Sequence, residues 1–279
     1  RRVGNLSLSI SLEGFEEVND MRRGEGVFNK VMATMDRLKK YGLIFGTSIC
    51  YTRKNIETVT SDEFLDMIIG KGCRFTWYFH YMPVGNDAAP DLLPTKEQRE
   101  YMYHRVREIR SMTGGKPIYA MDFQNDGEFV GGCIAGGRNY CHINANGDVE
   151  PCVFIHYSSA NIREVTLLEA LKQPLFMAYR DRQPFNDNHL RPCPMLENPE
   201  ILQRMVHETG AHSTDVEEAE PVEHLCGKCE AYACEWKETA DRLCHSLTPK
   251  RVPVRACTGF DGGFEAGEAI RMQCVKWQT

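Results

Sequence analysis

Several features that mark other protein classes are missing from this chain of 279 residues. It has no apolar run of the roughly 20 residues that a helix needs to cross a bilayer. No secretory signal is visible, although position 1 is arginine. No block of lysine and arginine stands out and the formal net charge is −6, which argues against nucleic acid as a main partner. We therefore expect a cytoplasmic protein that binds neither membrane nor nucleic acid.

Cysteine, by contrast, is abundant, with twelve residues in the chain. The chain is too long for a small disulfide scaffold, so metal binding is favoured over disulfides or inert buried thiols. Three cysteines, Cys133, Cys141 and Cys152, surround the turn Asn146-Gly147-Asp148, and Cys193 follows in the sequence RPCPM. Thiols beside glycine and proline at loop edges can converge on one metal centre, as in iron–sulfur and structural zinc sites.

The first 123 residues alternate between strand and helix patterns. Apolar and aromatic runs predict strands at 5–11, 43–52, 74–82 and 117–123. Apolar residues at helical spacing and capping signals predict helices at 27–41, from Ser61 to Gly70, and at 95–112, the last opening with a capping box at Thr95–Gln98. Such alternation predicts an α/β fold in which a parallel sheet forms an incomplete βα barrel.

The pattern changes near residue 124. Residues 124–247 combine short strands and Gly-rich turns with short helices expected at 166–180, 198–209 and 232–247. We expect three parts: part of a barrel at 1–123, a small loop-rich, cysteine-rich cluster-binding domain at 124–247, and an irregular tail at 248–279.

The motifs GC, EPC and RPC, which carry Cys133, Cys152 and Cys193, resemble the auxiliary-cluster extension called SPASM in radical S-adenosylmethionine (SAM) enzymes. The alternating half resembles the last strand–helix units of their partial barrel. The turn Ser11-Leu12-Glu13-Gly14 and Arg22 match the family's SAM ribose and carboxylate contacts, and Tyr81-Met82-Pro83-Val84-Gly85 matches its adenine segment. The resemblance therefore implies SAM-binding roles for Ser11, Glu13, Arg22, Tyr81 and Met82. A turn role for Ser11 and a surface role for Arg22 are the alternatives.

The same resemblance implies that Cys133, Cys152 and Cys193 hold an auxiliary [4Fe-4S] cluster. Cys141 is either the fourth ligand or a core thiol. Cys226, Cys229 and Cys234 form C-x-x-C-x-x-x-x-C, which is either a second site or part of a helix. Cys50 and Cys73 fit small buried side chains. Spacing alone does not separate iron from zinc, and the resemblance favours iron.

The family's defining motif, C-x-x-x-C-x-x-C, does not occur in this chain. We therefore expect the C-terminal portion of a radical SAM enzyme, inactive alone, whose full form modifies a peptide or small-molecule substrate with electrons from a donor such as ferredoxin or flavodoxin. The alternative is a non-catalytic iron–sulfur or zinc module that serves structure or electron transfer.

Overall fold

The computed structural model describes residues 4–246, so the expected irregular tail lies outside the described residues. Its main sheet has the order β1-β2-β3-β4, formed by β1 (Leu8–Ser11), β2 (Phe45–Tyr51), β3 (Phe75–His80) and β4 (Tyr119–Asp122). All three neighbouring pairs are parallel. The predicted parallel α/β sheet is confirmed, and each strand lies within its expected range.

Helices connect these strands: α1 (Glu16–Arg23), α2 (Val27–Lys40), α3 (Ile56–Thr60), α4 (Asp62–Gly70) and α5 (Lys96–Ile109), with a short 3₁₀ turn η1 (Pro90–Leu92). The predicted capping box is present, because Thr95 and Gln98 exchange both side chain–backbone hydrogen bonds. The sequence did not reveal α1 and α3. The helix α1 buries only Asn19 and α3 spans one turn, so neither carries a long apolar stripe.

The sheet has its own apolar core. Alternate residues of β2 and β3 pack against helical side chains, with Phe45, Ile49, Tyr78, Met35, Phe64, Leu65, Ile68 and Met102 fully buried. Burial on this scale holds the sheet and helices together, because each square ångström of apolar surface removed from water contributes about 25 cal/mol. This core fixes the carboxyl ends of β2 and β3, where a cavity lies.

The second half is loop-rich, as expected. It contains the hairpin β5 (His142–Ile143) with β6 (Val149–Glu150), the antiparallel pair β7 (Tyr157–Ser158) with β8 (His212–Ser213), and the helices α6 (Gly127–Val130), α7 (Leu167–Ala170), α8 (Pro174–Arg182), α9 (Pro199–Thr209) and α10 (Val222–Ser246). The single helix expected at 166–180 is two helices in the structure. The second one begins at Pro174, a residue favoured in the first turn of a helix, and Gln173 is its N-cap. Helix α10 begins at Val222, ten residues before the expected start at Tyr232, so C-x-x-C is helical.

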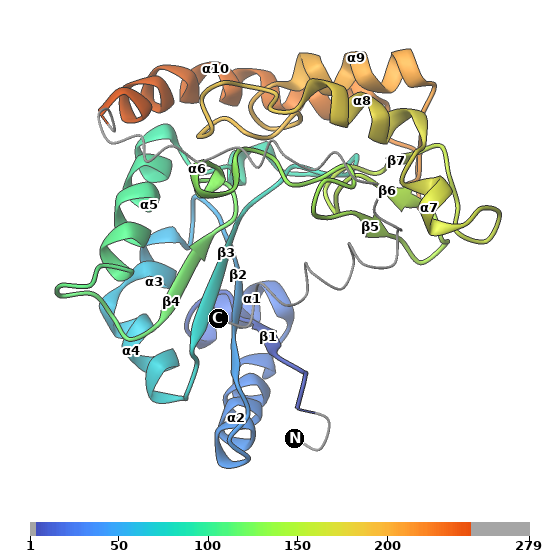
Figure 1. The fold of residues 1–279 in the computed structure, drawn as a ribbon. Coiled ribbons are helices and arrows are strands. Elements are labelled where there is room, and N and C mark those ends of the chain that lie inside the picture. The colour runs from blue at the N-terminus through green and yellow to red at the C-terminus, as the bar shows by residue number, and fades with distance from the viewer. Residues whose placement is uncertain (1–3, 247–279) are drawn as a thin grey trace, which may run out of the picture. The chain divides into compact units, whose positions relative to one another are not determined.

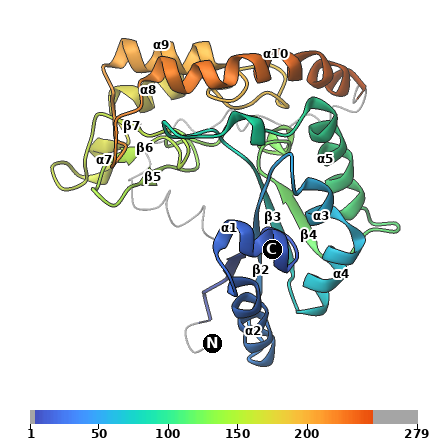
Figure 2. The same cartoon turned by 180° about the vertical axis from the view of Figure 1, so that it is seen from behind.

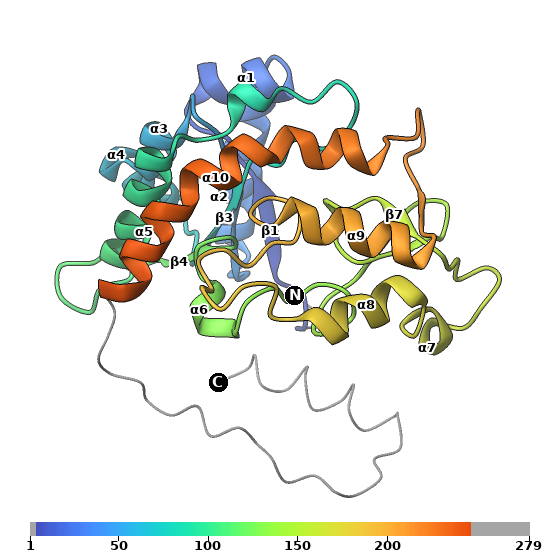
Figure 3. The same ribbon diagram turned by 90° about the horizontal axis from the view of Figure 1, so that it is seen from above.

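Helices α9 and α10 lie across the carboxyl-terminal ends of the main strands, and the small hairpins lie to one side of the sheet (Figures 1 and 2). Viewed from above, α10 runs from α9 towards α5 (Figure 3). A second apolar core joins these helices to the loops, with Tyr179, Leu196, Leu202, Met205 and Leu225 buried. Residues up to His245 form one compact unit. The boundary near residue 124 stays a prediction.

Candidate cluster site and adjoining pocket

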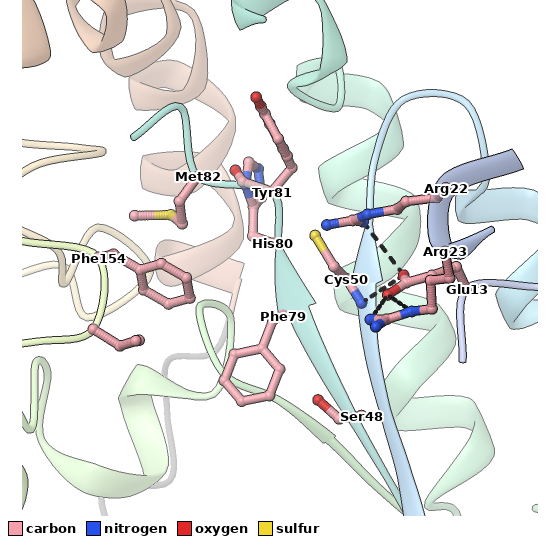
Figure 4. Close-up of a pocket in the computed structure, with 11 residues that line it drawn as sticks. Glu13, Arg22, Arg23, Ser48, Cys50, Phe79, His80, Tyr81, Met82 and Phe154 are labelled. Atoms are coloured by element: carbon pink, nitrogen blue, oxygen red, sulfur yellow. Dashed lines mark hydrogen bonds and ion pairs between the residues drawn. The ribbon is translucent and has the colours of Figure 1, made fainter. Parts of the chain in front are cut away.

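A cavity of about 360 Å³ lies at the carboxyl ends of β2 and β3. Its walls come from three regions: the turn after β1 and helix α1, the two strand ends, and the loop that follows Cys152 (Figure 4). That loop contributes Val153 and Phe154, so the segment that carries a predicted cluster ligand also closes the pocket. Ligand sites of parallel α/β sheets are found at this edge.

The polar side of the pocket is built on Glu13, whose side chain is buried. Its carboxylate accepts hydrogen bonds from Arg22 Nη1 at 3.4 Å, from Arg23 Nε at 3.1 Å and from the Cys50 backbone N–H at 3.1 Å. Two guanidinium groups therefore face one carboxylate, which leaves an excess of positive charge at this wall (Figure 4). A cationic wall suits an anionic group of a ligand.

Four of the five predicted SAM contacts, Glu13, Arg22, Tyr81 and Met82, line this cavity. Ser11 ends β1, where Ser48, itself a lining residue, is its register partner. Sequence reasoning missed Arg23, Ser48 and Cys50.

Cys50, which the sequence assigned to a buried role, is half-buried in the wall beside Arg22. Burial raises the pKa of its thiol, although the Arg22 guanidinium opposes that rise. The strand register could have indicated this role. Cys50 lies near the carboxyl end of β2, which pairs in parallel with β1, and the carboxyl ends of neighbouring parallel strands meet at the same edge of the sheet.

The predicted ligands Cys133, Cys152 and Cys193 all lie in or against the second core. Cys152 is buried within this core, and the other two pack against it. Burial raises the pKa of Cys133 to about 11 and that of Cys152 to about 12, and it raises the pKa of Cys193 well above its usual range. The Cys133 thiol further raises the pKa of both Cys152 and Cys193 by electrostatic repulsion.

Each of these three sulfurs interacts with the backbone of the residue two positions further along the chain. Cys193 Sγ accepts the N–H groups of Met195 and Leu196, each at 3.4 Å. The backbones of Ala135 and Phe154 stabilise the thiolates of Cys133 and Cys152 in the same way. Hydrogen bonds of this kind orient metal-bound sulfur and stabilise its negative charge.

Tyr179 supplies a test of whether a cluster fits here. Its side chain is fully buried, and its hydroxyl has no hydrogen-bond partner among the described residues. Burial raises the pKa of this phenol, and the thiols of Cys133, Cys193, Cys152 and Cys226 raise it further. Tyr179, Cys152 and Cys226 belong to the second core, and Cys133 and Cys193 pack against it. A buried unpaired hydroxyl is costly, and a cluster between these thiols offers sulfur acceptors. The residues therefore fit an iron–sulfur cluster.

The remaining predicted ligands lie elsewhere. Cys141 packs against a separate small core of Val149, Ala170 and Phe176. Cys226 and Cys229 are buried on the face of α10 that joins the second core, whereas Cys234 is exposed on the same helix. Eight positions along a helix turn a side chain by about 80°, which explains why Cys234 leaves the face that Cys226 occupies.

Within residues 4–246, no three His, Cys, Asp or Glu side chains are close enough to hold a single metal ion. This does not conflict with the fit to a cluster. In a four-iron cluster each thiolate binds a different iron, so the sulfurs stand further apart than around one ion.

The comparisons with known proteins agree with this picture. Residues 133–195 match the family model of SPASM, an iron–sulfur cluster-binding domain. Mycofactocin maturase MftC of Mycolicibacterium smegmatis is 30% identical over 156 residues, which are 53% of this chain and 39% of the relative. An AdoMet-dependent heme synthase of Oleidesulfovibrio alaskensis is 24% identical over 212 residues, 67% of this chain and 54% of the relative.

Among solved structures, anSMEcpe with bound AdoMet and the Cp18Cys peptide is similar with a TM-score of 0.46 at 13% identity, over 86% of this chain and 70% of that chain. The chain spans about half the length, or less, of the curated relatives it matches. For the part of the chain that the structure describes, no helix is both long and apolar enough to span a membrane. The resemblance to radical SAM proteins with a SPASM extension is confirmed at the level of sequence similarity: residues 133–195 match the model of the SPASM iron–sulfur cluster-binding domain, and the chain is similar to mycofactocin maturase and to AdoMet-dependent heme synthase.

Proposed function

We propose that this chain is the C-terminal portion of a radical SAM enzyme that holds an auxiliary [4Fe-4S] cluster and modifies a peptide or small-molecule substrate. The observation that carries the proposal is the junction at Cys152. This thiol lies in the second core, against which Cys133 and Cys193 pack, and the next two residues, Val153 and Phe154, line the pocket at the strand ends. A cluster and a ligand pocket built on one loop suit an enzyme whose substrate lies between them.

In this proposal Cys133, Cys152 and Cys193 bind the cluster. For the fourth ligand we favour Cys226 over Cys141, because Cys226 is buried in the second core together with Cys152 and Tyr179. Cys141 packs in a different apolar cluster. Cys229 stays next to Cys226, and Cys234 faces solvent. We do not propose a second cluster on α10 alone.

The pocket is proposed to hold SAM, which supplies the 5′-deoxyadenosyl radical in the family this chain resembles. Arg22 is partly exposed and can donate to the SAM carboxylate while Glu13 holds its guanidinium in place. Tyr81 and Met82 close the wall on the side of β3. Ser11 is proposed to reach the ligand from the end of β1, beside Ser48.

The substrate and the electron donor are proposed by analogy. The solved structure of anSMEcpe contains a bound peptide, and the relative mycofactocin maturase is named for the maturation of mycofactocin. A peptide substrate, with a ferredoxin or flavodoxin as reductant in the cytoplasm, is consistent with a negatively charged chain rich in free thiols.

The test is anaerobic reconstitution of the purified chain, followed by measurement of iron, zinc and acid-labile sulfide. Iron and sulfide in equal amounts, in the ratio of a four-iron cluster, support the proposal. Zinc without sulfide supports the alternative of a non-catalytic module. Reading the native gene upstream of Arg1 separates the two further, because an enzyme requires C-x-x-x-C-x-x-C there.

A further inference from the structure

A fully buried ion pair lies beside the proposed ligand Cys193. Arg99 of α5 and Glu197, in the loop before α9, stand 2.7 Å apart (Nη2 to Oε1), with neither side chain exposed. Arg99 also donates from Nε to Asn125 Oδ1 at 2.9 Å. Burying two charges costs desolvation free energy, whereas burying an apolar pair of the same volume does not. A contribution to stability alone is therefore a weak explanation for the presence of this ion pair.

The Glu197 carboxylate holds the turn that carries the thiol. Its Oε2 atom accepts the backbone N–H of Cys193 at 2.7 Å. The Glu197 side chain is fully buried, so its charge is weakly screened where it meets the Cys193 segment. One carboxylate therefore fixes one proposed ligand by its backbone and places a negative charge beside it.

Arg99 extends the network to the pocket. Its Nη1 donates to the Tyr232 hydroxyl at 3.4 Å, and that hydroxyl lies 2.5 Å from Nε2 of His80, which lines the pocket (Figure 4). The guanidinium carbon also lies 4.3 Å from the ring centroid of Trp236. A continuous buried set of polar contacts thus joins the pocket wall to the backbone of Cys193.

We propose that Arg99 and Glu197 are positioning residues for the auxiliary cluster: Glu197 anchors the Cys193 loop and lowers the cluster's reduction potential, and Arg99 compensates its charge. This inference rests on the proposed function, since it requires a cluster at these thiols. The potential of an iron–sulfur cluster depends on nearby charge and on hydrogen bonding at its ligands. A negative charge beside the cluster opposes the added electron, whereas an uncompensated guanidinium favours it.

The first experiment is a redox titration of reconstituted protein, followed by electron paramagnetic resonance. Glu197→Gln keeps an amide oxygen that can accept the Cys193 N–H but removes the charge. We expect iron content equal to the parent's and a midpoint potential shifted upward. The double variant Arg99→Met with Glu197→Gln removes both charges and is expected to bring the potential back towards the parent's value.

The matched control is Glu100→Gln, which breaks a partly exposed ion pair between α5 and α10 (Glu100 Oε2 to Arg242 Nη2, 2.6 Å). It is expected to leave the potential unchanged. An unchanged potential in Glu197→Gln at parental iron content overturns the proposal. Absence of iron from the parent itself would instead refute the proposed function.

A second variant covers the case in which Glu197→Gln does not fold. Glu197→Asp keeps the charge but is one methylene shorter, so it cannot reach both Arg99 and the Cys193 N–H. We expect faster release of iron to a chelator at nearly the parental potential. Parental rates of release in this variant, measured on folded protein, contradict the anchoring role.

Discussion

The Nε2 atom of His80 lies 2.5 Å from the hydroxyl of Tyr232, a residue 152 positions further along the chain. The other ring nitrogen, Nδ1, is 2.6 Å from the carbonyl oxygen of Tyr81 and therefore donates to it. The ring is neutral, so Nε2 accepts the proton of the Tyr232 hydroxyl. One histidine thus fixes the end of β3 to helix α10 and sets the shape of the pocket wall.

This arrangement makes stability depend on pH. Burial, aided by the Arg99 charge, lowers the pKa of His80 to about 3, from an unfolded value near 6.5. The folded state therefore binds fewer protons than the unfolded chain between these values. The His80 contribution is complete above pH 6.5 and is lost as the pH falls towards 3, at no more than about 1.4 kcal/mol per pH unit.

We expect the free energy of unfolding of the parent to fall more steeply from pH 7.5 to 5 than that of His80→Gln, measured by denaturant titration. The parent must be compared with His80→Gln because Asp122, which both proteins contain, changes the free energy of unfolding in the opposite direction as the pH falls. Burial raises its pKa to about 6, so its protonation adds stability as the pH falls. Equal slopes in the parent and His80→Gln would contradict the assignment of a neutral, buried His80.

The orphan hydroxyl of Tyr179 gives a second prediction. In metal-free protein, Tyr179→Phe removes a buried donor without a partner and is expected to raise the free energy of unfolding, by about 1–3 kcal/mol at most. In reconstituted protein the same change removes a hydrogen bond to cluster sulfur, so the gain should vanish or reverse. Thermal denaturation of both forms decides, with Tyr157→Phe as a control whose hydroxyl has a partner at Glu220. An equal change in the free energy of unfolding in the metal-free and the reconstituted protein would show that the Tyr179 hydroxyl does not contact the cluster.

The cysteine assignment is tested by iron content after anaerobic reconstitution. We expect Cys152→Ala and Cys193→Ala to lose most of the iron, because each supplies one of the converging thiols. Cys226→Ala should lose iron as well, whereas Cys141→Ala should retain it. Loss of iron in Cys141→Ala, with retention in Cys226→Ala, would show that Cys141 and not Cys226 is the fourth ligand of the cluster. Parental iron content in both Cys152→Ala and Cys193→Ala would defeat the site.

The sequence was sufficient for features with local causes. The apolar spacing of α2, the capping box at Thr95 and the aromatic run of β3 each depend on residues within a few positions, and all three formed where expected. The Gly and Pro residues beside Cys133, Cys152 and Cys193 also predicted the loops that bring these thiols to the second core.

Features that depend on distant partners could not be read in the same way. Arg99 looks like any charged residue of a helix, and only the fold places it against Glu197, 98 positions away, and Tyr232. The polar wall of the pocket has the same origin, since Cys50 joins Glu13 through strand register. The sequence did not predict the early start of α10, because Gly227 interrupts the helical pattern and glycine disfavours a helix interior. Burial of Leu225 and Cys229 in the second core outweighs the cost of that glycine.

The pocket assignment is tested by the binding of SAM. Arg22→Met removes the guanidinium proposed to contact its carboxylate, and charged hydrogen bonds contribute about 1.5–3 kcal/mol, so we expect affinity to fall by at least about tenfold. Equilibrium dialysis with labelled SAM measures it. Arg182→Met, which removes a partly exposed partner of Glu208, serves as the control. Equal affinity in the parent and Arg22→Met would remove Arg22 from the site.

The final prediction concerns catalysis by the chain itself. Reductive cleavage of SAM in this family needs an iron that is open to the amino and carboxylate groups of SAM, and the three-cysteine motif that provides it is missing from these 279 residues. In the proposed site four thiolates complete the cluster, which would leave no open iron. We therefore expect the reconstituted chain, given a strong reductant and SAM, to form no 5′-deoxyadenosine above the level of a Cys152→Ala control. Chromatography of the quenched reaction measures this. Turnover that disappears in the control would show that the auxiliary cluster itself can cleave SAM, and the division of labour proposed here would be wrong.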